Sequence, residues 1–181
     1  MFLRKTKARE PLPITMTAVR MGERLLQIGI DDPDIAGAIA AKVGLSGTAA
    51  LAVADDEGAA RANAAAAQAG ALIEVTVTPL DALPYPDASF DIVVVHGMRG
   101  EIGSASGVST AALKQCWRVL RPGGRGVAIT PGPKTGLGAL LRTAPAEAAG
   151  DSALAAFAAA GFHPVRVVGE LEGFRFTEGL K

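Results

Sequence analysis

The fold is decided by one stretch, Arg24-Leu25-Leu26-Gln27-Ile28-Gly29-Ile30-Asp31-Asp32-Pro33-Asp34-Ile35-Ala36. Residues 25–28 form a short apolar run bounded by turn residues, which predicts a strand buried on both faces of a sheet. A helix should follow, because Asp32 suits the N-cap, Pro33 suits the first helical position, and apolar residues recur every four positions up to Gly44. In open α/β sheets the ligand lies beyond the carboxyl end of such a strand, so we expect any site to lie here.

Composition limits the class of protein. The chain has 181 residues and a formal net charge of zero, and 49% of its residues are hydrophobic. This predicts a single domain over residues 22–181, preceded by an N-terminal tail and lead-in segment over residues 1–21. A neutral chain is not expected to bind nucleic acid. Residues 14–21 are predicted to be either a short strand or a segment whose apolar side chains cover one edge of the domain.

The cellular setting is also constrained by the sequence. Cys116 is the single cysteine, so neither a disulfide framework nor a metal-binding quartet is expected. The basic N-terminal residues precede prolines rather than an apolar core, so we expect no signal peptide, and no apolar run approaches membrane-spanning length. We therefore expect a cytoplasmic protein without a membrane span.

The remaining pattern alternates strands with helices. Strands are predicted at residues 48–54, 72–77, 91–96, 126–130, 165–168 and 174–177. Helices are predicted at residues 56–69 after an Asp55 cap, from Ser109 to about residue 120, and from an Asp151 cap to Gly161. Strand-helix units followed by a terminal strand pair indicate an α/β fold, a doubly wound, mostly parallel sheet with an antiparallel edge.

Two segments then resemble class I S-adenosylmethionine-dependent methyltransferases of the small-molecule, core-domain type. They are Leu-Pro-Tyr-Pro-Asp-Ala-Ser-Phe-Asp at residues 83–91 and Trp-Arg-Val-Leu-Arg-Pro-Gly-Gly at residues 117–124. They are similar to the family's segments that lead into its fourth and fifth strands. The resemblance covers nearly all of residues 22–181. It implies a Rossmann-like sheet of seven strands, six of them parallel and the last antiparallel.

The segments that hold the cofactor in this family depart from its pattern. The resemblance implies a first motif with an acidic residue in the strand and then a glycine-rich turn. Gln27 stands at the acidic position, Gly29 is retained, and the next two glycine positions hold Asp31 and Pro33. The family's second acid, which accepts hydrogen bonds from the ribose hydroxyls, aligns with Val53. Its third, which contacts the adenine, aligns with Pro79.

Nearby acids could replace those that are missing. Asp55 or Asp56 could accept from the ribose after a shift of one or two residues, and Asp81 could stand in for the acid at Pro79; Asp55 could instead be only a helix cap. His96, at the carboxyl end of a predicted strand, is a weak candidate for a catalytic base and is otherwise a structural histidine with its hydrogen bonds satisfied. The candidate cofactor-binding residues are Gly29, Ile30, Asp55, Asp56, Asp81 and His96.

Two functions follow from these observations. The first is a pseudoenzyme, a methyltransferase-fold protein with a degenerate cofactor site that serves as a binding, regulatory or structural protein. The second is an active methyltransferase that uses S-adenosylmethionine on a small-molecule acceptor through an atypical pocket. S-Adenosylmethionine is the expected cofactor if the chain is active, and no cofactor is expected otherwise.

The expected partners are a small molecule or a protein. A homodimer contact is predicted at residues 14–21 together with the terminal strand pair. A third hypothesis places a different ligand, such as another nucleotide, in the same crevice, with contacts from the loop at residues 97–107 and from Arg99.

Overall fold

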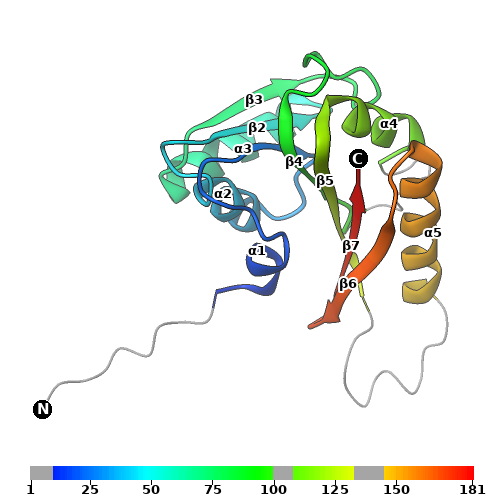
Figure 1. Cartoon of the computed structure of the whole chain (residues 1–181). Coiled ribbons are helices and arrows are strands. Elements are labelled where there is room, and N and C mark those ends of the chain that lie inside the picture. The colour runs from blue at the N-terminus through cyan, green and yellow to red at the C-terminus, as the bar shows by residue number, and fades with distance from the viewer. Residues whose placement is uncertain (1–9, 100–107, 133–144) are drawn as a thin grey trace, which may run out of the picture.

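The computed structural model describes residues 10–99, 108–132 and 145–181, with backbone alone for residues 145–151. Its centre is a seven-stranded sheet with the strand order β3-β2-β1-β4-β5-β7-β6 (Figure 1). The strands are β1 (Arg24–Ile28), β2 (Thr48–Val53), β3 (Ile73–Val77), β4 (Phe90–His96), β5 (Leu120–Pro131), β6 (Val165–Leu171) and β7 (Phe174–Leu180). The helices are α1 (Leu12–Met16), α2 (Pro33–Ala41), α3 (Asp56–Ala69), α4 (Thr110–Val119) and α5 (Pro145–Ala160).

The sheet is mostly parallel, as predicted. The pairs β1–β2, β1–β4, β2–β3 and β4–β5 are parallel, whereas β7 is antiparallel to both β5 and β6. The carboxyl ends of β1, β2, β4 and β5 therefore meet at one edge of the sheet, together with the beginning of β7. This confirms the predicted α/β fold and places the site region at that edge.

Helices cover both faces of the sheet (Figure 1). On β1, Leu26 and Ile28 belong to the apolar cluster formed with α4 and α5, while Leu25 belongs to the cluster formed with α1 and α2. This alternation is what a strand buried on both faces requires. Gln27 therefore shares the α2 face with Leu25. The helices α2 and α3 approach closely at Gly37, where an added Cβ atom would lie 2.7 Å from the carbonyl oxygen of Ala65.

Most predicted helix boundaries agree with the structure. Asp32 caps α2 by accepting from the backbone N–H groups of Asp34 and Ile35, and Ser109 caps α4 by accepting from Ala112. Gly70 ends α3 in the left-handed conformation, at φ 62°.

Three boundaries were predicted wrongly or left open. α5 begins at Pro145, so Asp151 lies inside the helix and is not its cap, because the alanine-rich residues before it favour helix. β5 begins at Leu120 rather than residue 126, and its pairing with β4 shifts register between Phe90 and Ile92, so the predicted turn is an irregularity inside a strand. Residues 12–16 form a helix, which excludes the short strand suggested there.

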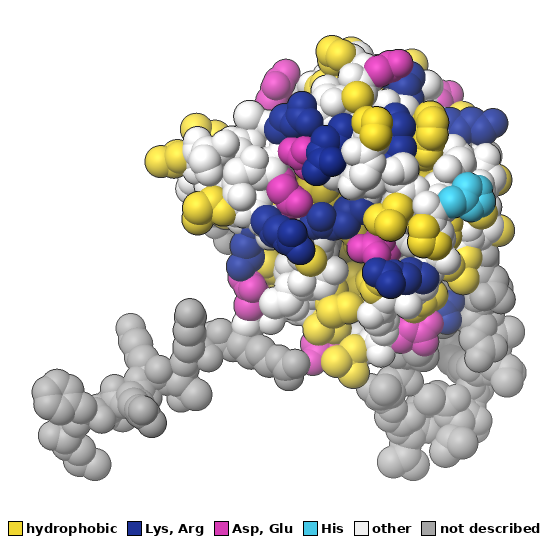
Figure 2. Space-filling view, viewed as in Figure 1, with side chains coloured by type: hydrophobic (Ala, Val, Ile, Leu, Met, Phe, Trp, Pro, Cys, Tyr) yellow, Lys and Arg dark blue, Asp and Glu magenta, His cyan; other side chains and the backbone are white. Residues whose placement is uncertain are grey.

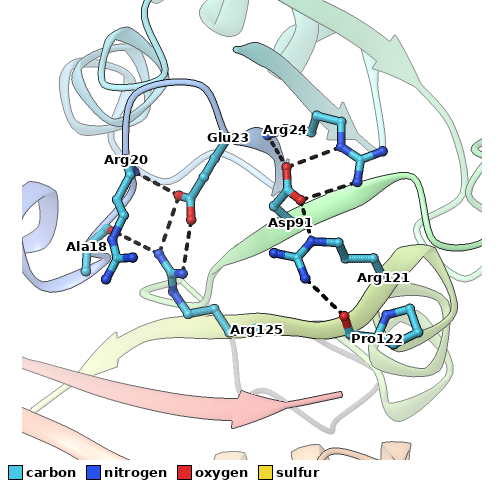
Figure 3. A network of polar contacts seen from close by, with 8 residues as sticks. All are labelled: Ala18, Arg20, Glu23, Arg24, Asp91, Arg121, Pro122 and Arg125. Carbon is cyan, nitrogen blue, oxygen red and sulfur yellow. Dashed lines mark hydrogen bonds and ion pairs between the residues drawn. The ribbon is translucent and has the colours of Figure 1, made fainter. Parts of the chain in front are cut away.

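The amino-terminal edge of the sheet is held by charged side chains (Figure 3). Asp91 accepts hydrogen bonds from the backbone N–H of Arg24 and from the guanidinium groups of Arg24 and Arg121. Burial acts to raise the pKa of Asp91, but these hydrogen bonds outweigh it and hold that pKa well below its usual range. Glu23 pairs with Arg125 beside this cluster.

Charges of both signs are interspersed on the molecular face shown in Figure 2. Arginine and lysine side chains lie among aspartates and glutamates rather than gathering into one field, in keeping with the net charge of zero. The ion pairs of Asp91 with Arg24 and Arg121 join β1, β4 and β5 at the end of the sheet opposite the candidate site.

Candidate functional site

The turn between β1 and α2 forms the centre of the candidate site. Gly29 follows β1 at φ +72°, a backbone conformation that residues with a side chain rarely adopt. Its N–H donates to the carbonyl of Ala52 at 2.9 Å. Ile30 is buried in a cluster with residues of α2, α3 and β2 and is 7% exposed. Gly29 therefore keeps the backbone of a tight turn, whereas Ile30 serves as a core residue.

The next residue ties this turn to the end of β4. One carboxylate oxygen of Asp31, Oδ2, accepts a hydrogen bond from the backbone N–H of Met98 at 2.6 Å. The following carboxylate, of Asp32, is occupied through Oδ1 by the first N–H groups of α2. The positive end of the helix dipole is thus already matched by carboxylates of the chain itself.

A buried polar pair lies beneath the turn. Gln27 is fully buried, and its Nε2 donates to the carbonyl oxygen of Ala36 at 2.9 Å. This contact fixes the orientation of the amide, so Oε1 faces His96, whose Nε2 lies 2.8 Å away. Because an amide oxygen can only accept, Nε2 of His96 must carry the proton. In the neutral ring, Nδ1 is then an acceptor.

The electrostatic environment keeps His96 neutral near physiological pH. Burial lowers the pKa of His96 to about 4, against the opposing influence of the carboxylates of Asp31 and Asp32. Nδ1 has no hydrogen-bond partner among residues 10–99, 108–132 and 152–181. The structure therefore presents a neutral, buried imidazole with one acceptor nitrogen available.

A hollow of ≈ 240 Å³ opens beside His96. Its polar lining comes from Asp31, Asp32, His96 and Arg99. Its apolar lining comes from Ile35, Met98, Ile129 and Phe174. These residues come from the turn between β1 and α2, from the first turn of α2, from the end of β4 and the residues just after it, from the end of β5 and from the start of β7. The hollow thus lies on the α2 face of the sheet, at the carboxyl edge predicted to hold the site.

The candidates at the end of β2 are not among the residues that line this hollow. Val53 is buried, and its Cβ would lie 3.0 Å from a Cβ placed on Gly58. Asp55 caps α3 by accepting from the N–H of Gly58 at 2.7 Å, and Asp56 is an exposed residue in the first turn of α3. Asp55 therefore has a structural role that the sequence had also allowed.

The loop after β3 supplies no buried acid. Asp81 is exposed, and the neighbouring Thr78 turns its hydroxyl toward the carbonyl of Ala82. Arg99 lines the hollow, as the nucleotide hypothesis requires, but residues 100–107 of the predicted ligand loop lie outside the described residues. In the part of the chain that the structure describes, no group of three or more histidine, cysteine or acidic residues could hold a metal ion.

Sequence reasoning missed three features of the site. It treated Gln27 as a lost acid and did not predict its contact with His96, and it did not predict the contact of Asp31 with Met98 or the contribution of Phe174. A signal was present for the first, since Gln27 is the single polar residue among the four buried residues of β1. Within the described residues, no helix is long and apolar enough to cross a membrane.

Comparisons with known proteins agree with this architecture. The chain is 29% identical over 115 residues to the ubiquinone/menaquinone biosynthesis C-methyltransferase UbiE of Hydrogenovibrio crunogenus, an alignment that covers 62% of this chain and 43% of that protein. The chain therefore spans less than half the length of this curated relative.

Solved structures show the same fold. An S-adenosylmethionine-dependent methyltransferase from Aquifex aeolicus superposes with a TM-score of 0.71 at 16% identity, covering 92% of this chain and 86% of the other. The [4+2]-cyclase SpnF superposes with a TM-score of 0.60 at 23% identity, covering 87% of this chain and 56% of the other.

The sequence model of the family described as "Methyltransferase domain" matches residues 36–128, just over half of the chain. The match spans α2 to β5 and so includes both segments on which the resemblance rested. The chain therefore belongs to the methyltransferase-domain family, within the class I S-adenosylmethionine-dependent methyltransferases.

Proposed function

We propose that this chain is a non-catalytic member of its family, a protein that has lost the S-adenosylmethionine site and now binds a small molecule or a protein partner. The observation that carries the proposal is the hydrogen bond from the N–H of Met98 to Asp31. This hydrogen bond joins the turn after β1 to the end of β4. At the turn after β1, the resemblance to the family implies a glycine-rich sequence that lets the cofactor approach the backbone. A carboxylate in that turn adds bulk and negative charge in the same place.

The ribose position supports the same conclusion. Val53 is 2% exposed and offers no acceptor to a hydroxyl group. A hydrogen bond to a charged acceptor contributes roughly 1.5–3 kcal/mol. Losing such bonds at the ribose and at the adenine would remove about 3–6 kcal/mol, against about 8 kcal/mol for micromolar binding. The residues present therefore do not fit this cofactor well.

A second candidate function is an active methyltransferase that holds the ribose through Asp55. The observation in its favour is the place of Asp55 just beyond β2, with one carboxylate oxygen, Oδ1, engaged by Gly58. Its other oxygen could accept from a ligand. The relative and the structural neighbours that are named as methyltransferases support this function. The neighbour named as a cyclase shows that the fold also supports other chemistry.

Thermal unfolding with and without ligand tests the proposal. A ligand present at 100 times its Kd stabilises the folded state by about 2.7 kcal/mol, which raises the Tm measurably. We expect no change in Tm with either S-adenosylmethionine or S-adenosylhomocysteine. A clear rise with either compound would contradict the proposal.

Two variants would then locate the binding. Asp55→Ser keeps an N-cap oxygen but removes the carboxylate, so it should abolish the rise in Tm if Asp55 holds the ribose. Asp34→Ser, which removes an acid from the first turn of α2, is the matched control and should leave the rise unchanged.

A further inference from the structure

The hollow beside His96 combines three features that together define a ligand. It has an apolar wall, two carboxylates and an acceptor nitrogen of a histidine.

The acceptor is Nδ1 of His96. The residue is 6% exposed, its Nε2–H is used by Gln27, and Gln27 is itself held by Ala36. The ring therefore cannot present an N–H to the hollow while it is neutral. Nδ1 is not among the buried side-chain atoms that lack a partner in the described residues, so it reaches solvent at the hollow, and its natural complement is a hydrogen-bond donor on a ligand.

The charge at the rim favours a cationic donor. Asp31 uses Oδ2 on Met98, and Asp32 uses Oδ1 on the start of α2, so each carboxylate keeps a second oxygen for other contacts. Arg99 also lines the hollow and contributes one positive charge against these two negative charges. The positive end of the α2 dipole, equivalent to roughly half a charge, offsets only part of the difference, so the lining keeps an excess of negative charge that attracts a cation and disfavours an anion.

The apolar wall sets the size and nature of the rest of the ligand. Ile35, Met98, Ile129 and Phe174 supply aliphatic, thioether and aromatic surface. The volume of ≈ 240 Å³ lies just below the range of about 300–1,000 Å³ that is usual for drug-sized ligands. The ligand should therefore be a small molecule with one apolar group.

We propose that this hollow binds a small primary amine with an apolar or aromatic body, whose ammonium group donates to Nδ1 of His96 and pairs with the carboxylate of Asp32. The apolar body lies against Ile129 and Phe174. This inference rests on the proposed function in one respect, that the amine is bound without being methylated. The assignment of the binding site itself does not depend on that statement.

The probe for the test is 2-phenylethylamine, titrated into the full chain near pH 7. Its neutral analogue 2-phenylethanol and its anionic analogue 3-phenylpropanoate have the same apolar body. We expect saturable binding of the amine, at least about tenfold weaker binding of the alcohol, and no binding of the acid. Equal affinities, a preference for the acid, or no binding of the amine up to about 10 mM would overturn the proposal.

A matched pair of variants locates the ammonium group. Asp32→Asn keeps a good N-cap for α2 and a similar volume but removes the charge, so it should weaken amine binding about tenfold. Asp34→Asn removes an equivalent charge from the same turn at a residue that does not line the hollow, and it should leave binding unchanged. Equal effects of the two variants would overturn the assignment.

The imidazole provides a second readout that does not depend on a variant. In nitrogen-detected NMR, His96 should show protonated Nε2 and unprotonated Nδ1, and the Nδ1 signal should shift when the amine binds. An Nδ1 signal unchanged at saturation would overturn the proposed contact. Failure of amine binding leaves the S-adenosylmethionine titration unaffected, so the two proposals can fail separately.

Discussion

Oε1 of Gln27 lies 2.8 Å from Nε2 of His96, across two neighbouring strands and 69 positions apart in the sequence. Because Nε2 of Gln27 is committed to the carbonyl of Ala36, this single contact fixes the tautomer of a buried histidine at the edge where a ligand would bind. The polar residue in β1 therefore links the start of α2 to the end of β4. Its role is to orient His96 and not to replace a missing carboxylate.

The first prediction concerns the removal of this link. Gln27→Met keeps the length of the side chain but leaves the buried Nε2–H of His96 unpaired, which should lower the free energy of unfolding by about 1–3 kcal/mol. Urea denaturation measures this change. Gln27→Glu, the matched variant, keeps an acceptor and adds a negative charge, so it should raise the pKa of His96 above about 4. Unchanged stability in the methionine variant would contradict the role assigned to Gln27.

The second prediction concerns pH. The folded-state pKa of His96 is lowered to about 4, below its value of 6.5 in an unfolded chain, so the unfolded state binds more protons between these values. The free energy of unfolding therefore keeps its full value above pH 6.5. It decreases as the pH falls toward 4, by about 3 kcal/mol in total, because His96 takes up a proton more readily in the unfolded chain.

Urea denaturation at a series of pH values measures this dependence. His96→Gln should lose most of it, whereas His163→Gln, which changes an exposed histidine, should retain it. An identical pH dependence in the wild-type chain and the His96 variant would show that His96 is not the group responsible.

The third prediction concerns the amino-terminal edge of the sheet. Asp91→Ala removes the acceptor of the Arg24 backbone N–H and two guanidinium contacts, and it should destabilise the fold by about 1–3 kcal/mol. Asp87→Ala breaks an ion pair with Arg118 in which the Asp87 side chain is 77% exposed, so it should cost about 0–1 kcal/mol. Chemical denaturation of both variants checks this order, and equal losses would contradict it.

Much of the fold could be predicted from local sequence. Buried apolar runs marked the strands, and Asp32, Asp55 and Ser109 marked the starts of three helices because capping is a local interaction. The start of α5 was missed because an alanine-rich segment extends a helix without a distinct signal. The β5 boundary was missed because the glycines at residues 123 and 124 predicted a turn, whereas pairing with β4 and β7 keeps the segment in the sheet.

The site was less predictable because its contacts are long-range. Sequence reasoning placed His96 at the end of a strand and Asp31 in the turn. It could not predict that His96 contacts Gln27 or that Asp31 contacts Met98, since both contacts depend on the parallel register of β1 and β4. The roles as cofactor contacts stay predictions for all six candidates, Gly29, Ile30, Asp55, Asp56, Asp81 and His96.

The loss of the S-adenosylmethionine site is tested directly by isothermal titration of the intact chain with S-adenosylhomocysteine, after a check that no ligand copurified. We expect no saturable heat up to about 1 mM ligand, because the turn after β1 is occupied by Asp31 and the ribose position holds Val53. Saturable binding with a micromolar Kd would contradict this expectation and would identify the chain as a cofactor-binding methyltransferase.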